Sequence, residues 1–205
     1  MHEGEGLEQG RSPFLVVKNE NRKFRIFFID MAIIKPLRGY TPKIGNNCFI
    51  AENAVVLGDV TMGDDCSIWY SAVLRGDVNT IKIGNRVNIQ DGAVVHTLYN
   101  KSVSEIGDDV SVGHNAVIHG AKIGNNVLVG MGAIVLDNAV VADNTIIAAG
   151  AVVLGNTVAD GGVWAGVPAR KVKESSEAVG IAAHKNAQGY MMYKDWYKEE
   201  NTNEN

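Results

Sequence analysis

The chain has 205 residues, of which 46% are hydrophobic and 20% are charged, and its formal net charge is -4. These values suit one cytoplasmic globular domain with its own core, and they exclude the strongly basic surface that nucleic acid or an anionic membrane would require. No apolar run reaches the ~18 residues of a membrane span. Cys48 and Cys66 lack a metal-type spacing, as expected for buried thiols in a reducing compartment.

Residues 1–30 differ in character from the rest of the chain. The first ten residues carry acidic groups where a signal peptide would be basic, and the apolar stretches around Phe14–Val17 and Ile26–Ile29 are short. We therefore expect residues 1–30 to form an accessory or disordered extension, with the domain proper starting at Met31.

A six-residue repeat organises the middle of the chain. An aliphatic residue recurs at every sixth position in four runs, and glycine often follows it. The repeat positions are Ile44, Ile50, Val56, Met62, Ile68 and Leu74, then Ile83, Ile89 and Val95, then Ile106, Val112 and Ile118, and finally Ile123, Val129, Val135, Val141, Ile147 and Val153. A period of six matches neither the helical period of about 3.6 residues nor the two-residue period of an ordinary strand.

This hexapeptide repeat predicts an all-β fold, a parallel β-helix, over residues 31–172. Three hexapeptides would make one triangular coil of about 18 residues, and neighbouring coils would pair as parallel strands. Gly-Asn pairs at the corners, such as Gly124-Asn125, suit backbone turns with positive φ. The period does not fix the hand of the coil. Residues 173–205 are expected to form a C-terminal α-helix and tail, with an apolar face that packs on the coil.

Two histidines within the repeat are placed to share a metal ion. His96 and His119 each directly follow an inward repeat residue, and their separation of 23 residues is one coil plus an excess that fits a bulge within Thr97–Ser104. Both imidazoles should project outward from adjacent coils, close enough to reach one metal. Neutral imidazole suits zinc, and also iron or cobalt.

A third histidine, His114, occupies a different place in the repeat, one hexapeptide before His119. Outward side chains from different sides of a triangular prism diverge, so one chain is not expected to bring all three together. A homotrimer would do so, with His96 and His119 from one subunit and His114 from the next. The alternative that these are ordinary surface or interface histidines stays open on spacing alone.

Several spaced motifs resemble those of the γ-class carbonic anhydrases over about 33–198. Together they are specific, whereas hexapeptides alone are shared with many acyltransferases. The matching stretches are residues 72–78 (AVLRGDV), 88–92 (NIQDG), 94–97 (VVHT), 112–120 (VGHNAVIHG) and 163–169 (VWAGVPA).

The resemblance implies a left-handed β-helix and the reversible hydration of CO2 to bicarbonate by zinc-bound hydroxide. It also implies that the three histidines bind the metal across a trimer interface. The family's intersubunit ion pair is matched by Arg75 and Asp77. Its polar shell is matched by Asn88, Gln90 and Asp91, with Gln90 near the metal-bound water. A tyrosine of its C-terminal helix is matched by Tyr190. From the residues alone, an ordinary interface salt bridge for Arg75 and a corner role for Asn88 stay open.

The sequence departs from well-known active members of that family at the positions that would carry protons. Val78 stands where they have glutamate, and Thr97–Ser104 is short and has no acid, which leaves Glu105 as an uncertain substitute. The short form resembles a subgroup whose members are often weak enzymes, so hydration should depend on buffer as the proton acceptor. The alternatives are a hexapeptide acyltransferase with one histidine as general base, a metal-dependent thioesterase, and a catalytically weak structural trimer.

Overall fold

The computed structural model describes residues 14–18, 24–28 and 32–203, and the chain divides into two units, Met1–Met31 and Ala32–Asn205. In the first unit, strand β1 (Phe14–Lys18) pairs antiparallel with β2 (Phe24–Phe28), with Phe14 opposite Phe28. Part of the predicted extension therefore has regular structure. The rest of it lies outside the described residues, so an accessory role for residues 1–30 stays a prediction.

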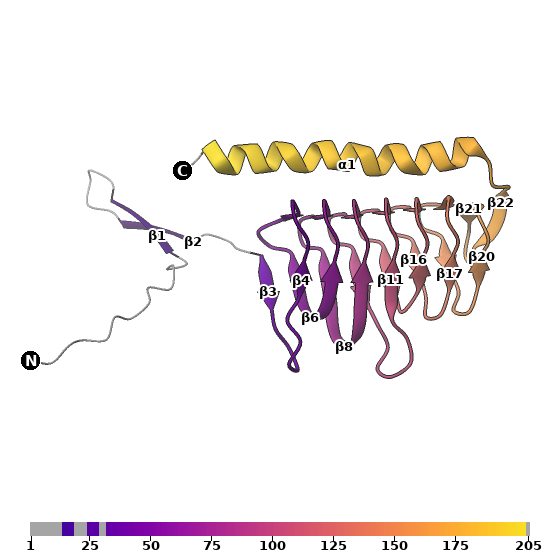
Figure 1. Cartoon of the computed structure of the whole chain (residues 1–205), viewed down its shortest axis with the longest axis horizontal. Coiled ribbons are helices and arrows are strands. Elements are labelled where there is room, and N and C mark those ends of the chain that lie inside the picture. Colours follow the sequence, from indigo (N-terminus) through magenta and orange to yellow (C-terminus); the bar gives the residue numbers. More distant parts are fainter. Residues whose placement is uncertain (1–13, 19–23, 29–31, 204–205) are drawn as a thin grey trace, which may run out of the picture. The chain divides into compact units, whose positions relative to one another are not determined.

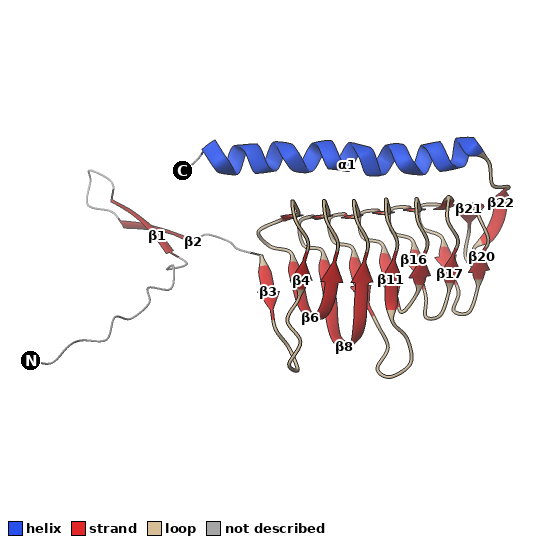
Figure 2. Cartoon of the chain, in the orientation of Figure 1, coloured by secondary structure: helices blue, strands red, loops and turns tan. Residues whose placement is uncertain are grey.

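The second unit is a left-handed parallel β-helix followed by one long helix (Figure 1). Short strands alternate with turns along its whole length (Figure 2), because each hexapeptide supplies one short side of a triangular coil. The expected fold class is confirmed. Two strands, β6 (Val55–Met62) and β8 (Val73–Ile83), are long enough to run around a corner and belong to two faces each.

The strands of the coil form three faces. The first face contains the starts of β6 and β8 together with β3 (Ile33–Lys35), β10 (Val94–His96), β13 (Val117–His119), β16 (Ile134–Val135) and β19 (Val152–Val153). The second face contains the ends of β6 and β8 together with β4 (Lys43–Ile44), β11 (Ser104–Ile106), β14 (Lys122–Ile123), β17 (Val140–Val141) and β20 (Val158–Ala159). The third face contains β5 (Phe49–Ile50), β7 (Ser67–Ile68), β9 (Asn88–Ile89), β12 (Ser111–Val112), β15 (Leu128–Val129), β18 (Thr145–Ile147), β21 (Gly162–Ala165) and the antiparallel β22 (Arg170–Lys173).

The aliphatic repeat residues form the core. All of them are buried except Ile44 and Ile50, which pack against the core from the first coil. Small residues such as Ala72 and Ala116 fill the corners between them with no exposed surface. Stacking of like residues on successive coils thus removes a continuous aliphatic column from water, which stabilises the coil without large aromatic side chains.

Two consecutive coils are longer than the others, and the excess lies at one edge of the prism. Strand register gives coil lengths of 18, 21, 23 and 17 residues between Val55, Val73, Val94, Val117 and Ile134. The extra residues fall in the corners that join the first face to the second, within 75–82 and 96–105. Both corners lie beside the strand ends that carry His96 and His119.

Helix α1 (Glu177–Asn203) runs back along the third face of the coil (Figure 1). Its contact is partly aromatic: Trp69 of the coil packs edge-on against Tyr190 and Tyr197, with ring centroids 5.4 and 5.2 Å apart. The fully buried Lys194 lies 3.6 Å from Asp65 on the coil. Within the described residues, no helix has the length and apolar character needed to cross a membrane. The expected C-terminal helix is therefore present, and it brings Tyr190 to the coil.

Candidate metal centre

His96 and His119 stack on adjacent coils at the end of the first face. Strands β10 and β13 pair in parallel with His96 directly opposite His119, as the 23-residue spacing predicts. Both side chains are largely covered, with 14% and 27% of their surface exposed. Nδ1 of His96 lies 3.2 Å from Nε2 of His119, so one ring nitrogen of each histidine faces the other.

The outer nitrogen of each ring faces a carboxylate. Nε2 of His96 lies 2.9 Å from Oδ1 of Asp77, and Nδ1 of His119 lies 2.9 Å from Oδ2 of Asp137. Asp77 also accepts a hydrogen bond from Nη1 of Arg75 at 2.5 Å, within the same chain. Burial acts to raise the pKa of Asp77, but the hydrogen bonds from His96 and Arg75 outweigh it and hold that pKa below its ordinary value.

Asp137 is held ionised in the same way. Burial acts to raise its pKa, but hydrogen bonds from Ser102 and His119 outweigh this effect, so the pKa lies below its ordinary value. An ionised carboxylate has no proton to donate, so the ring nitrogens that face Asp77 and Asp137 must carry hydrogens. Two neutral imidazoles have only two such hydrogens. In that state the inner nitrogens, Nδ1 of His96 and Nε2 of His119, carry lone pairs that face the gap between the two rings.

Two such lone pairs repel each other unless a proton or a metal ion lies between the two nitrogens. Two nitrogens bound to one tetrahedral zinc at about 2.0–2.1 Å would lie roughly 3.3 Å apart, close to the spacing in this pair. A carboxylate on the outer nitrogen also makes imidazole a more basic, correctly oriented ligand. The donor set therefore fits a zinc ion, and the same imidazole nitrogens suit iron or cobalt.

His114 lies at the opposite edge of the first face, on the corner between β12 and β13. It repeats the same pattern, because its Nδ1 lies 2.8 Å from Oδ2 of Asp91. Its other ring nitrogen, Nε2, lies 3.4 Å from the hydroxyl of Tyr190 on α1. Burial and the charge of Asp91 raise the pKa of Tyr190 to about 12, so this hydroxyl stays protonated at neutral pH.

A buried amide network supports the backbone of His114. Gln90 accepts a hydrogen bond from the His114 amide at 3.2 Å and donates one to Oδ1 of Asn88 at 3.0 Å. Asn88 in turn donates to Ser111 on the next coil at 2.8 Å. Asn88 and Gln90 are almost fully buried, with 1% and 4% exposed surface. Both of their amide groups are therefore fixed in orientation.

The residues singled out in the sequence thus form two groups in one chain. One edge of the first face brings together Arg75, Asp77, His96 and His119. The other edge brings together Asn88, Gln90, Asp91, His114 and Tyr190. Among the residues that the structure describes, no three candidate metal-binding side chains come together in a single chain. Neither group alone would give a zinc ion three histidine ligands.

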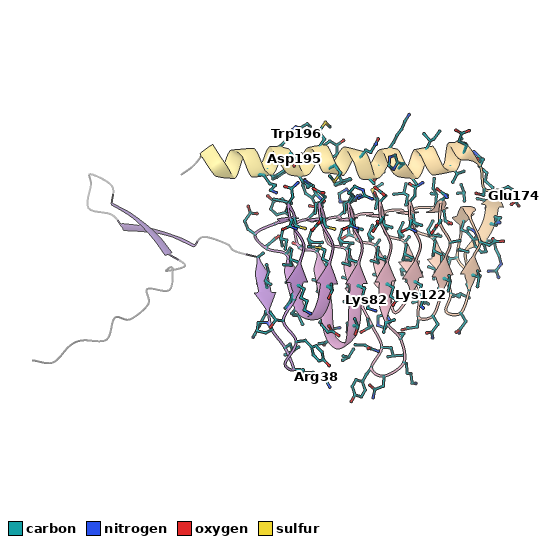
Figure 3. All side chains as sticks on the ribbon, viewed as in Figure 1. Arg38, Lys82, Lys122, Glu174, Asp195 and Trp196 are labelled. Carbon is teal, nitrogen blue, oxygen red and sulfur yellow. The ribbon has the colours of Figure 1, made fainter. Side chains whose placement is uncertain are left out.

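Sequence reasoning missed Asp137 and Ser102. Asp137 follows His119 by 18 residues, and this one-coil separation is the signal that could have indicated it. Glu105, the uncertain substitute acid, lies instead on the second face, where Lys82 and Lys122 bind its carboxylate at 3.6 and 3.3 Å. Figure 3 shows both lysines on that face of the coil.

Comparison with known proteins shows the family to which the chain belongs. Residues 41–76 and 120–155 match the family described as bacterial transferase hexapeptide (six repeats). Protein YrdA of Escherichia coli is 42% identical over 172 residues, which cover 80% of this chain and 94% of YrdA. Gamma carbonic anhydrase 2, a mitochondrial protein of Arabidopsis thaliana, is 39% identical over 168 residues, which cover 79% of this chain and 60% of that protein. The chain belongs to the hexapeptide-repeat family that contains the γ-class carbonic anhydrases.

A solved structure of this hexapeptide-repeat family supports the same fold. A hexapeptide transferase family protein from Anaplasma phagocytophilum is 38% identical and superposes with a TM-score of 0.76, covering 80% of this chain and 98% of that protein. The family thus includes proteins named as carbonic anhydrases and proteins named as transferases. The fold alone does not choose between these activities.

Proposed function

We propose that this protein is a γ-type carbonic anhydrase that works as a homotrimer and hydrates CO2 reversibly to bicarbonate. Each metal ion would be held by His96 and His119 of one subunit and by His114 of the next. The observation that carries the proposal is the shared pattern of the three histidines. Each has one ring nitrogen 2.8 or 2.9 Å from a carboxylate and the other directed away from it. Metal-binding histidines typically have such partners, whereas a general base needs only one histidine.

The trimer follows from the incomplete ligand sets at the two edges of the first face. A three-fold axis parallel to the prism would bring the edge with His96 and His119 of one subunit to the edge with His114 of its neighbour. Three equivalent sites would result. Arg75 lies beside this edge and is 44% exposed even though it binds Asp77, so it is available to contact the neighbouring subunit as well.

The remaining site residues would position reactants. When bound, zinc supplies a Lewis acid that generates a hydroxide nucleophile at neutral pH. Gln90 and Asn88 hold each other and the His114 backbone, so their amides present fixed polar groups beside the ligand. Tyr190 closes the same side with a protonated hydroxyl. CO2 has no charge, and the half-apolar wall around His114, which includes Met131 and Ile146, suits such a substrate.

Subunit mixing would test this proposal directly. One variant carries His114→Ala, and a second carries His96→Ala with His119→Ala. Each homotrimer alone should bind no zinc at the site and hydrate no CO2. When the two are unfolded together and refolded, every mixed trimer should regain one of its three sites, because one interface then combines the intact halves. Zinc content and stopped-flow CO2 hydration measure this recovery.

The rival functions predict different results. A site formed within one chain would recover nothing on mixing. An acyltransferase would bind coenzyme A and stay active without metal, and a thioesterase would need the metal but hydrolyse thioesters faster than it hydrates CO2. A structural trimer would bind zinc and show no hydration at any buffer concentration. Because Val78 and the corner within 97–104 carry no acid, the enzyme should be faster at higher buffer concentration.

A further inference from the structure

Asp137 joins the metal-ligand pair to the longest corner of the coil. It lies in the corner after β16, one coil beyond His119. Its Oδ2 lies 2.9 Å from Nδ1 of His119, and its Oδ1 accepts a hydrogen bond from the hydroxyl of Ser102 at 2.6 Å. One carboxylate therefore bridges a histidine of the first face and a serine of the corner within 96–105.

Ser102 is itself held in place and is almost fully buried, with 5% exposed surface. Its hydroxyl accepts a hydrogen bond from the Leu98 amide at 3.0 Å, and its carbonyl accepts one from Nδ2 of Asn79 at 2.9 Å. The hydroxyl thus uses its single donor on Asp137 and one of its two acceptor lone pairs on the Leu98 amide. Leu98 and Asn79 thus hold Ser102 in place, and the Ser102 hydroxyl in turn holds the carboxylate of Asp137.

Gly120, which directly follows His119, leaves room for this contact because it has no side chain. A Cβ atom at residue 120 would lie 2.0 Å from Oγ of Ser102 and 2.3 Å from Oδ1 of Asp137. The backbone φ of Gly120, +61°, also lies in the region that favours glycine. Any larger residue would push the serine and the carboxylate apart. The bridge is therefore built into three separate coils, at Ser102, Gly120 and Asp137.

We propose that Asp137 is a positioning residue for the metal ligand His119, and that Ser102 holds Asp137 in that role. This inference rests on the proposed metal site. Asp137 accepts the Nδ1 hydrogen of His119, which leaves the Nε2 lone pair free and aims it at Nδ1 of His96. Without the carboxylate, the ring could rotate or carry its hydrogen on Nε2, and that nitrogen would no longer be a ready ligand.

The test compares zinc binding by four full-length variants with that of the wild-type protein. Zinc affinity is measured by competition with a chelator, and coordination geometry is measured from the absorption spectrum of the cobalt(II)-loaded protein. Asp137→Ala should weaken zinc binding by roughly 10- to 100-fold and change the cobalt spectrum. Asp137→Asn keeps an acceptor oxygen and should recover part of the affinity. Ser102→Ala should fall between wild type and Asp137→Ala.

Asp143→Ala is the matched control. Asp143 is also a corner carboxylate, and it accepts hydrogen bonds from the backbone amide of Asn125 at 2.7 Å and from the side-chain amide of the same residue. Among the described residues, no histidine is one of its hydrogen-bond partners. This control should leave zinc affinity and the cobalt spectrum unchanged even if it lowers the melting temperature. Wild-type affinity and spectrum in Asp137→Ala would overturn the positioning role alone. Absence of zinc binding by the wild-type protein would overturn the proposed function, and the positioning role with it.

Discussion

Arg86 and Asp109 show how a single ion pair ties one coil to the next. Nε and Nη2 of Arg86 lie 2.8 and 2.7 Å from the two carboxylate oxygens of Asp109, a two-bond contact across adjacent corners. Both residues have positive φ, 55° and 57°, which costs backbone energy that the contact helps to offset. The hydrogen bonds from Arg86 hold the pKa of Asp109 below its ordinary value despite partial burial.

We predict that Asp109→Asn lowers the free energy of unfolding by about 1 kcal/mol at pH 7, a modest value because Arg86 is 41% exposed and solvent screens the pair. A carboxyl with a lowered folded pKa contributes stability above its unfolded pKa of about 3.9, and this contribution is lost as pH falls through the folded value. The difference between wild type and variant should therefore shrink below about pH 4. Urea unfolding at neutral and acidic pH measures it, and a difference independent of pH would contradict the prediction.

At the scale of elements, a glycine in the coil and a glycine in the helix differ in how much space a side chain would have. Gly84 lies in a corner where the next coil passes directly over it. A Cβ there would lie 2.7 Å from the carbonyl carbon of Gly107 and 2.3 Å from Oδ1 of Asp108. Gly189 lies within α1, and a Cβ there would make only ordinary contacts of 3.7 Å with Tyr193.

Two alanine substitutions should therefore shift stability in opposite directions. Gly84→Ala must displace the backbone of the next coil and should cost roughly 2 kcal/mol or more. Gly189→Ala should stabilise the protein by about 0.5–1 kcal/mol, because alanine loses less backbone entropy in a helix. Thermal unfolding followed by circular dichroism measures both. A stabilised Gly84→Ala protein would show that neighbouring coils are not closely packed at this corner.

At the scale of the whole molecule, the chain has two units that divide between Met31 and Ala32. The residues of the proposed metal site, from Arg75 to Tyr190, all lie in the second unit. The repeat starts at Ile44, and β3, the first strand of the coil, starts at Ile33. The second unit therefore contains every residue that the proposed site requires.

We expect a protein that starts at Met31 to keep the melting temperature of the full chain, together with the proposed trimeric state and zinc content. Removal of the first unit deletes a separate two-stranded hairpin, and two strands alone add little independent stability. Calorimetry, light scattering and metal analysis of the two proteins make the comparison. A large loss of zinc or of melting temperature in the shorter protein would show that residues 1–30 support the coil.

Much of the fold follows from the sequence, because the repeat has one dominant physical cause. A coil with a narrow triangular core must have an inward aliphatic residue at every sixth position. The repeat therefore predicted that Val95 and Ile118 are buried, and that His96 and His119, which follow them, stack on adjacent coils. Lengthened coils were also visible as breaks in the repeat. The family resemblance added Asn88, Gln90, Asp91 and Tyr190, which the structure places around His114.

Only the tertiary structure revealed which carboxylate faces which histidine. The 18-residue separation of His119 and Asp137 hinted at a contact, but only the structure shows that Asp137 faces His119, whereas Asp143 accepts hydrogen bonds from the backbone and side-chain amides of Asn125. Glu105 was a candidate acid by its position in the chain, yet strand register places it between two lysines on another face. The direction of a corner side chain depends on the lengths of the neighbouring coils. Those lengths determine which corner residues lie next to each other only when the coils have stacked in the folded chain.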